Sequence, residues 1–200
     1  MIEKNKNKFS VIYFEDSIPK HFPKKTVFDW AYCNVNRFGI KKNTRVTWVT
    51  DFKTFDSSET LLKTFSSTTR NEIRKVLKSG MDISINFNAD PKQVLELVGS
   101  MFKDKKIHRI HDDTEYEPKE DTFWIMLKHN NIHVAHAYLL DRKHSTVVLK
   151  YSASVFRSIE QEEKNKTGYL NKYLHFQEIN YFKNLGIQKM DWGGWLLEGI

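Results

Sequence analysis

The sequence predicts a mixed α/β fold around one sheet, in which an antiparallel meander is followed by a parallel β-α-β crossover. Its 200 residues, 40% of them hydrophobic and 14% aromatic, are enough for one domain with a sizeable core. Three strand-like segments, 122–128, 132–140 and 145–154, are separated by short polar turns, which is typical of a meander. A helical segment then leads to a last strand at 187–192, and such a crossover places that strand parallel to 145–154.

The first 60 residues show the weakest organisation. Phe9–Phe14 and Arg45–Thr50 are rich in β-branched and aromatic residues, which predicts strands. The stretch between them contains two prolines and fits no single element. We therefore expect one domain over 1–200, with N-terminal strands or an extension before residue 60.

The pattern is clearer from residue 57 onward. Ser57 or Ser58 is placed to cap a helix, and 68–78 is strongly helical because its apolar residues recur at helical spacing. Gly80 ends this helix, and 81–87 alternates apolar and polar residues as a half-buried strand does.

Two charged stretches separate the remaining elements. A helix is predicted at 91–102, followed by a long loop at 103–120 that is functional or mobile. A charged loop at 157–166 precedes a helix from Thr167 to Leu185, which ends at Gly186.

The charge of the chain predicts attraction to polyanions. Its formal net charge is +7 and its pI is about 9.3. Nucleic acid, anionic membrane surfaces and phosphorylated substrates all fit this balance, as does a solvated basic surface without a special partner.

The sequence favours a cytoplasmic protein. Cys33 is its one cysteine, so no disulfide can form within the chain, and a reducing compartment is expected. The polar N-terminus lacks the apolar region of a signal peptide. No stretch approaches the roughly 18 apolar residues that span a membrane.

We expect no metal site. His133 and His136 lie three apart on a predicted strand and therefore point to opposite faces. His108 and His111 have no cysteine and no third histidine at useful spacing.

Three segments carry a more specific pattern. They are STTRNEIRKVLKSG at 67–80, LKYSAS at 149–154 and TGYLNKYLHFQEINYFKNLGIQKMDWGG at 167–194. Together they resemble the GNAT-fold acyltransferases, and most of all the Fem-type aminoacyltransferases of peptidoglycan interpeptide bridges and their cell-surface polysaccharide relatives. The resemblance covers 67–194 and implies a GNAT-like sheet with helices on both faces. In that fold the fourth and fifth strands are parallel but splay apart, and the acyl donor lies in the gap.

The sequence departs from the family in two ways. The GNAT pyrophosphate signature is missing, because 157–168 offers only Lys164, Lys166 and Gly168. The resemblance thus leaves two donor substrates open, acyl-CoA and aminoacyl-tRNA, and it implies no tightly bound cofactor. The chain also ends soon after Gly194, earlier than the family does, so the N-terminal strands or a homodimer partner would complete the sheet, or the protein is truncated.

Acyl transfer to an amine requires a polarised carbonyl and a deprotonated amine held close together. By the resemblance, the donor would lie between the two splayed strands and against the start of the helix near Thr167, where free N–H groups favour phosphate. The candidate donor-binding residues are Ser152, Ser154, Lys164, Lys166, Gly168, Asn171, Gly193 and Gly194. A plain Gly-Gly turn and an ordinary helix cap with solvated lysines are the alternatives.

Candidates for the acceptor side are a basic stripe and four proton acceptors. Arg70, Arg74 and Lys78 recur every four residues on one helix face, where they would bind a carboxylate or phosphate or remain solvated. The candidate general bases are Tyr151, His175, Glu178 and Asp191, each of which could instead pack or cap.

The resemblance implies an N-acyltransferase that moves an acyl or aminoacyl group to an amine of an anionic acceptor. That acceptor would be a small-molecule or lipid-linked precursor of the cell wall or of a surface polysaccharide, and tRNA would be a partner if it carries the donor. The alternative is a non-catalytic module on the same fold that binds RNA or another protein.

Overall fold

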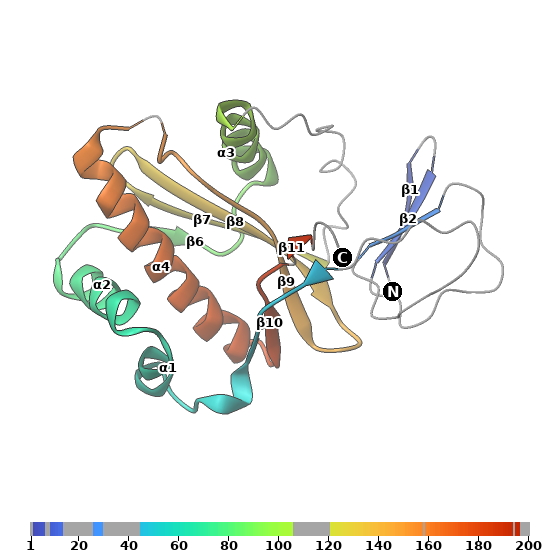
Figure 1. Cartoon of the computed structure of the whole chain (residues 1–200), viewed down its shortest axis with the longest axis horizontal. Helices are drawn as coiled ribbons and strands as arrows, with labels where there is room; N and C mark the ends of the chain where they lie inside the picture. The colour runs from blue at the N-terminus through green and yellow to red at the C-terminus, as the bar shows by residue number, and fades with distance from the viewer. Residues whose placement is uncertain are drawn as a thin grey trace.

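A six-stranded mixed sheet is the largest sheet of the fold (Figure 1). The computed structural model describes residues 45–105, 121–157 and 159–193, together with the strands at 2–6, 9–13, 26–29 and 195–196. In chain order, the six strands are β5 (Val49–Asp51), β6 (Ser84–Asn86), β7 (Thr122–His129), β8 (Ile132–Asp141), β9 (Thr146–Ser154) and β10 (Lys189–Asp191). They lie side by side in the order β5-β10-β9-β8-β7-β6.

The predicted meander and crossover are both present. Strands β7, β8 and β9 pair antiparallel in sequence order. Helix α4 (Gln161–Asn184) then returns the chain to β10, which pairs parallel to β9 with Met190 opposite Val147. The other pairings in this sheet are antiparallel, so β9–β10 is its one parallel pair.

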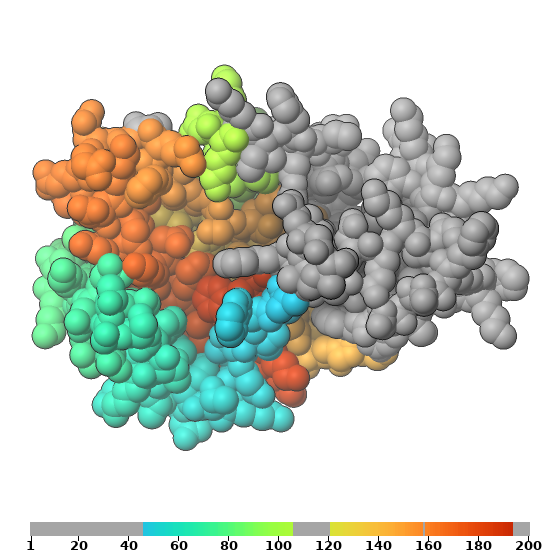
Figure 2. All heavy atoms as spheres, in the orientation of Figure 1, coloured from blue at the N-terminus to red at the C-terminus, as the bar shows by residue number. Residues whose placement is uncertain are grey.

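Helices cover both faces of the sheet, as predicted. Helices α1 (Ser58–Thr64), α2 (Ser67–Lys78) and α4 share one core with the inward side chains of β7 and β8, such as Leu127 and Val134. Helix α3 (Pro91–Asp104) packs on the opposite face, where Met126 and Ala135 lie. Alternate residues of one strand thus serve two cores. In Figure 2 the side chains of α1 and α2 form a continuous surface with those of α4.

Side-chain caps fix the starts of the first helices. Ser57 caps α1 in a capping box with Thr60, as its position predicted. Ser66 caps α2, and Asp90 caps α3 ahead of Pro91.

The start of α4 differs from the prediction. The helix begins at Gln161 rather than near Thr167, so the segment 157–166 is largely helical and is not a charged loop. Glutamates in the first turn interact favourably with the helix dipole, and Glu162 pairs with Lys166 at 3.0 Å one turn later. These polar contacts stabilise a turn that has no apolar periodicity.

The N-terminal strands contribute to two sheets besides the main one. The predicted strand at 45–50 is divided into β4 (Arg45–Val46), which pairs with β11 (Trp195–Leu196), and β5, which pairs antiparallel with β10. An N-terminal strand therefore completes one edge of the main sheet, which is one of the arrangements expected from the sequence. Strands β1 (Ile2–Lys6), β2 (Phe9–Tyr13) and β3 (Thr26–Asp29) form a three-stranded sheet.

Two further predictions differ in extent. The strand expected at 81–87 is limited to β6, and the helix expected at 91–102 continues to Asp104. Most of the loop predicted at 103–120 lies outside the described residues. Within the described part of the chain, none of the helices has the length and apolar character needed to cross a membrane.

Candidate functional site

Strand β10 pairs with β9 along all three of its residues and then ends, whereas β9 continues. They pair only from Thr146 to Val148 on β9, although β9 continues to Ser154. On its other side β9 carries a bulge at Lys150, because Leu149 opposes Tyr138 while Tyr151 opposes the preceding residue of β8. A bulge leaves the extra residue outside the regular ladder and is common beside functional sites. The pairing between β9 and β10 thus ends at Val148, six residues before the end of β9.

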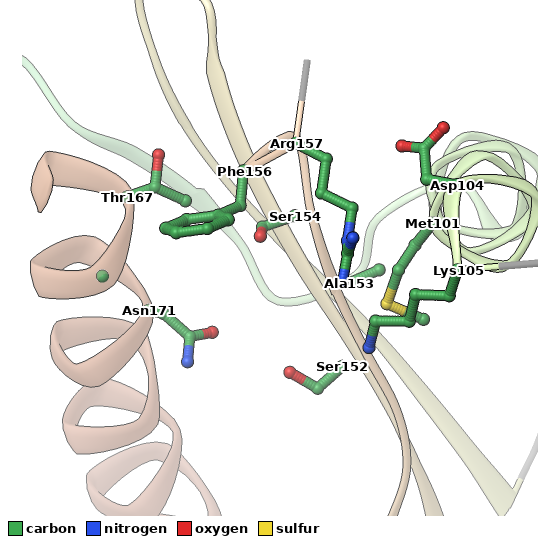
Figure 3. Close-up of a pocket in the computed structure, with 11 residues that line it drawn as sticks. Met101, Asp104, Lys105, Ser152, Ala153, Ser154, Phe156, Arg157, Thr167 and Asn171 are labelled. Atoms are coloured by element: carbon green, nitrogen blue, oxygen red, sulfur yellow. The ribbon is translucent and has the colours of Figure 1, made fainter. Parts of the chain in front are cut away.

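A pocket of about 270 Å³ lies beside this half of β9, between the end of α3 and the second and third turns of α4 (Figure 3). Four of the predicted donor-binding residues line it: Ser152, Ser154, Gly168 and Asn171. A Cβ added to Gly168 would meet no atom within 4 Å, so the wall of the pocket is open at that position. Figure 3 shows the Asn171 amide extending from α4 toward β9.

Two basic side chains that the sequence analysis missed also line the pocket. Lys105 follows the end of α3 and Arg157 follows β9, and both are exposed. Of the described residues that line the pocket, Asp104 is the acidic one. Two cations against one carboxylate favour an anionic ligand, and a guanidinium can bind phosphate or carboxylate through two parallel hydrogen bonds. These residues are far apart in sequence, so no local motif could have identified them.

The predicted lysines do not line the pocket. Lys166 pairs with Glu162 and lies, like Lys164, on the part of α4 that precedes it. Because α4 begins at Gln161, the N–H groups of Thr167 and Gly168 lie inside the helix, where they are used by helical hydrogen bonds. The helix start predicted near Thr167 is therefore wrong, and phosphate binding by Lys164 and Lys166 stays a prediction.

A buried polar cluster lies under the pocket, on the face covered by α4. The Glu178 carboxylate accepts hydrogen bonds from His136 Nδ1, at 2.8 and 2.9 Å to its two oxygens, from Tyr138 Oη at 2.6 Å and from His175 Nδ1 at 3.1 Å. The side chains of His136 and Glu178 are 0% exposed, and that of His175 is 13% exposed. The second ring nitrogen of His136 lies 2.9 Å from Asn171 Oδ1, which joins this cluster to the pocket wall.

The cluster shifts the proton affinities of its members. Burial alone would raise the pKa of Glu178, but the charge and hydrogen bond of His136 and the hydrogen bond and charge of His175 outweigh it and lower the pKa to about 2. Burial, together with the neighbouring charge of His136, lowers the pKa of His175 despite its bond to Glu178. Burial raises the pKa of Tyr138 well above its usual value, and the Glu178 charge and hydrogen bond add to that effect. Glu178 is thus ionised at neutral pH, while Tyr138 keeps its proton.

His136, His175 and Glu178 are the one group of three possible metal ligands among the described residues. Their arrangement does not suit an ion. A metal lies in the plane of each imidazole that binds it, at about 2.0–2.1 Å for zinc. The two imidazole rings are stacked 4.2 Å apart at 12°, so one ion cannot lie in both ring planes. The hydrogen bonds to Glu178 already occupy the nitrogens that would face it.

Three other predicted residues have clear structural contacts. Asp191 is buried, and its Oδ1 accepts hydrogen bonds from Thr47 Oγ1 and from the Gly193 N–H, the latter at 2.8 Å. Gly193 has a φ of 82°, and a Cβ there would lie 2.9 Å from the Leu149 carbonyl oxygen. Asp191 and Gly193 therefore shape the turn after β10. Tyr151 points to the opposite face of the sheet, against Phe102 of α3, and is not part of the buried cluster.

The basic stripe lies apart from the pocket. Arg74 and Lys78 are exposed on α2, and Arg70 Nη1 donates to the Lys63 carbonyl at 3.4 Å. None of the three lines the pocket, and acceptor binding by the stripe stays a prediction. Gly194 lies outside the described residues.

The buried cluster had a partial signal in the sequence. His136 lies between Val134 and Tyr138 on the inward face of its strand, where an ionisable residue is unusual. Glu178 falls among the apolar positions of α4, next to Ile179. Such positions predict a buried partner, but not which one.

No protein-family model matches the sequence, and no curated protein matches it. Solved structures do match. FemX superposes with a TM-score of 0.57 over 77% of this chain and 54% of the FemX chain, at 13% sequence identity. The chain has the fold of FemX. The predicted resemblance to the GNAT-like, Fem-type fold is therefore confirmed at the level of the fold. L-PGS from Bacillus licheniformis matches with a TM-score of 0.47 and 11% identity, over 80% of this chain and 50% of that one. The chain thus spans about half the length of each of these proteins.

Proposed function

We propose that the protein transfers an acyl or aminoacyl group from an activated donor to an amine, with the donor bound in the pocket between β9 and α4. The position of that pocket is the observation that supports this most. It lies beside the half of β9 that extends past its pairing with β10, in a fold shared with FemX. Splayed parallel strands are where the family resemblance places the donor.

The reaction has a simple balance. The amine nitrogen forms a bond to the donor carbonyl carbon, and the ester C–O or thioester C–S bond breaks. The amine loses one proton and the leaving hydroxyl or thiol gains one. The protein therefore has to bind the donor, stabilise the charge on the carbonyl oxygen and accept the amine proton.

His175 is the residue we propose as the general base. Its Nδ1 is held by Glu178 and its ring lies 4.8 Å from that of Trp192, just after β10. Its Nε2 has no hydrogen-bond partner within the part of the chain that the structure describes. The lowered pKa keeps the ring neutral at pH 7, so Nε2 offers a lone pair. A carboxylate that holds one nitrogen of a histidine while the other accepts a proton is a common catalytic arrangement.

The basic residues of the pocket and the net charge of the chain indicate which donors and acceptors fit. Lys105 and Arg157 at the pocket favour a donor with phosphate groups, which both acyl-CoA and aminoacyl-tRNA have. The net charge of +7 favours an anionic acceptor, and we propose an amine-bearing precursor of the cell wall or of a surface polysaccharide. On the sequence argument from the single cysteine, we place the reaction in the cytoplasm.

The test is thermal unfolding with a panel of donors: acetyl-CoA, longer acyl-CoAs, free CoA and charged tRNA. A ligand at about 100 times its Kd adds about 2.7 kcal/mol of stability, which corresponds to roughly 5–11 °C in the Tm of a chain of this size. At least one donor is expected to give such a shift. If none does, the protein is a binding module or has another activity.

A matched pair of variants locates the site. Gly168→Leu places a side chain at the open wall of the pocket and favours the helix by up to about 1 kcal/mol. Asn165→Leu makes a similar change at an exposed position of the same helix. The donor shift is expected to disappear in Gly168→Leu and to persist in Asn165→Leu. Equal shifts in both variants would place the donor elsewhere.

A further inference from the structure

The buried cluster beneath the pocket contains more than a general base requires. A carboxylate holding His175 accounts for Glu178, but not for His136, which is stacked against His175 and fully buried. Burying an ionisable pair of this kind is often no better for stability than burying apolar side chains of the same size. A role in the pocket would explain why His136 is there.

A hydrogen bond to Asn171 joins His136 to the pocket wall. Its Nδ1 lies 2.8 Å from Glu178 and its Nε2 lies 2.9 Å from Asn171 Oδ1. Both ring nitrogens thus face oxygen atoms, and each bond requires a proton on the nitrogen. An imidazole that donates in both directions carries a proton on each ring nitrogen, and the Glu178 carboxylate lies beside it.

In this arrangement the oxygen of the Asn171 amide faces His136. The Nδ2 hydrogens are then the remaining polar atoms of the side chain, and they have no hydrogen-bond partner among the described residues. Asn171 lines the pocket and extends toward β9 (Figure 3). Ser152, also in the pocket wall, lies opposite His136 in the β8–β9 register. The pocket wall therefore includes an amide whose oxygen is held by the buried His136–Glu178 pair.

We propose that the Glu178–His136 pair is a positioning device that fixes Asn171 so that its Nδ2 hydrogens bind the carbonyl oxygen of the acyl donor. This inference rests on the proposed acyl transfer. The carbonyl oxygen gains negative charge when the amine attacks, and a donor already aimed at it stabilises that charge without reorganisation. The positive charge of His136 behind the amide strengthens the effect, because it polarises the amide toward the pocket. Asn171 would be a catalytic residue, and His136 would act through it.

The first test compares kcat and KM for the donor that stabilises the protein in the panel. Asn171→Ala is expected to lower kcat about 100-fold and to change KM little, and Asn171→Asp is expected to be at least as impaired, since it replaces the N–H groups by an anion. Asn165→Ala, on the exposed side of the same helix, is the control and is expected to be unchanged. A kcat within twofold of wild type for Asn171→Ala would overturn the proposal.

A double-mutant cycle tests the positioning role of His136. His136→Gln is expected to lower kcat in the wild-type background and to have little further effect in the Asn171→Ala background, because both changes remove the same contact. Additive effects would show that His136 does not act through Asn171. Thermal unfolding of each variant shows whether it is folded.

A measurement on the wild-type chain does not depend on activity or on any variant's stability. With 15N-labelled histidine, the resonances of His136 are expected to show protons on both ring nitrogens at pH 7. An unprotonated Nε2 would turn the Asn171 amide over, present its oxygen to the pocket and overturn the proposal. If the wild type transfers from no donor, the proposed function fails and this inference with it. If the wild type is active and Asn171→Ala is equally active, only this inference fails.

Discussion

Replacing Glu178 by glutamine should change the stability of the protein in a pH-dependent way. The hydrogen bonds and charges of two histidines lower the pKa of this buried carboxyl to about 2 from an ordinary 4.5. Each unit corresponds to about 1.4 kcal/mol, so the folded state favours the ionised carboxylate by roughly 3 kcal/mol. Glu178→Gln removes this contribution and leaves His136 beside a neutral amide. We expect the variant to be about 3 kcal/mol less stable than wild type at pH 7.

The sign of the pH dependence follows from the lowered pKa. A carboxyl group whose pKa is lower in the folded state stabilises the protein above its unfolded pKa, and this stabilisation is lost as the pH falls toward the folded value. The difference between wild type and Glu178→Gln should therefore be constant above about pH 5.5 and fall to about half by pH 3. His175 makes a separate contribution to wild-type stability. Because its pKa is lowered in the folded state, wild type also loses stability as the pH falls below about 6.5.

Urea unfolding at pH 7, 5.5, 4 and 3 measures this difference. Glu162→Gln is the matched control on the same helix, because the Glu162 side chain is 83% exposed and its bond to Lys166 is a surface pair. The control is expected to stay within about 0.5 kcal/mol of wild type at each pH. A Glu178→Gln variant as stable as wild type at pH 7, or a difference that does not shrink on acidification, would refute the ion-pair description of the cluster.

Two further predictions concern the glycines and the cations of the site. Gly193→Ala is expected to lower the free energy of unfolding by more than about 1 kcal/mol, since φ is 82° and the new Cβ would lie 2.9 Å from a carbonyl oxygen of β9. Gly168→Ala should be neutral or stabilising, because its Cβ would meet no atom within 4 Å. Urea unfolding of the two variants measures both effects. Lys105→Ala with Arg157→Ala is expected to weaken donor binding at least tenfold and to reduce its salt dependence, which a titration at two ionic strengths measures. Unchanged affinity in that double variant would show that the cations do not face the donor.

The arrangement of the core strands could be predicted from the sequence because their signals are local. The alternation in 122–154 with short turns specifies neighbours, and the helix between β9 and β10 leaves little choice of connection. The start of α4 could not be found in this way. The segment from Gln161 to Lys166 is entirely polar, so it shows no hydrophobic periodicity. The acidic residues of its first turn are the sequence feature that indicates a helix start there.

The candidate site was only partly accessible from the sequence. Family resemblance pointed to the end of β9 and to α4, and so to Ser152, Gly168 and Asn171 in the pocket wall. Lys105 and Arg157 meet there only because α3 and β9 pack together. The bond between His136 and Glu178 joins residues 42 apart in sequence, and its existence depends on which inward position of β8 faces which turn of α4. The spacing of residues in the sequence does not predict which position of β8 faces which turn of α4.

The rate of amide formation tests the central claim most directly. Wild type, Gly168→Leu and Asn165→Leu are each incubated with an amine acceptor and with the donor that stabilises the wild type, and the acylated amine is quantified by mass spectrometry. We predict product from wild type and Asn165→Leu and at least a 100-fold slower reaction in Gly168→Leu. Product formed at the wild-type rate by Gly168→Leu would show that the pocket between β9 and α4 is not the donor site, and no product from the wild type with any donor would contradict acyl transfer itself.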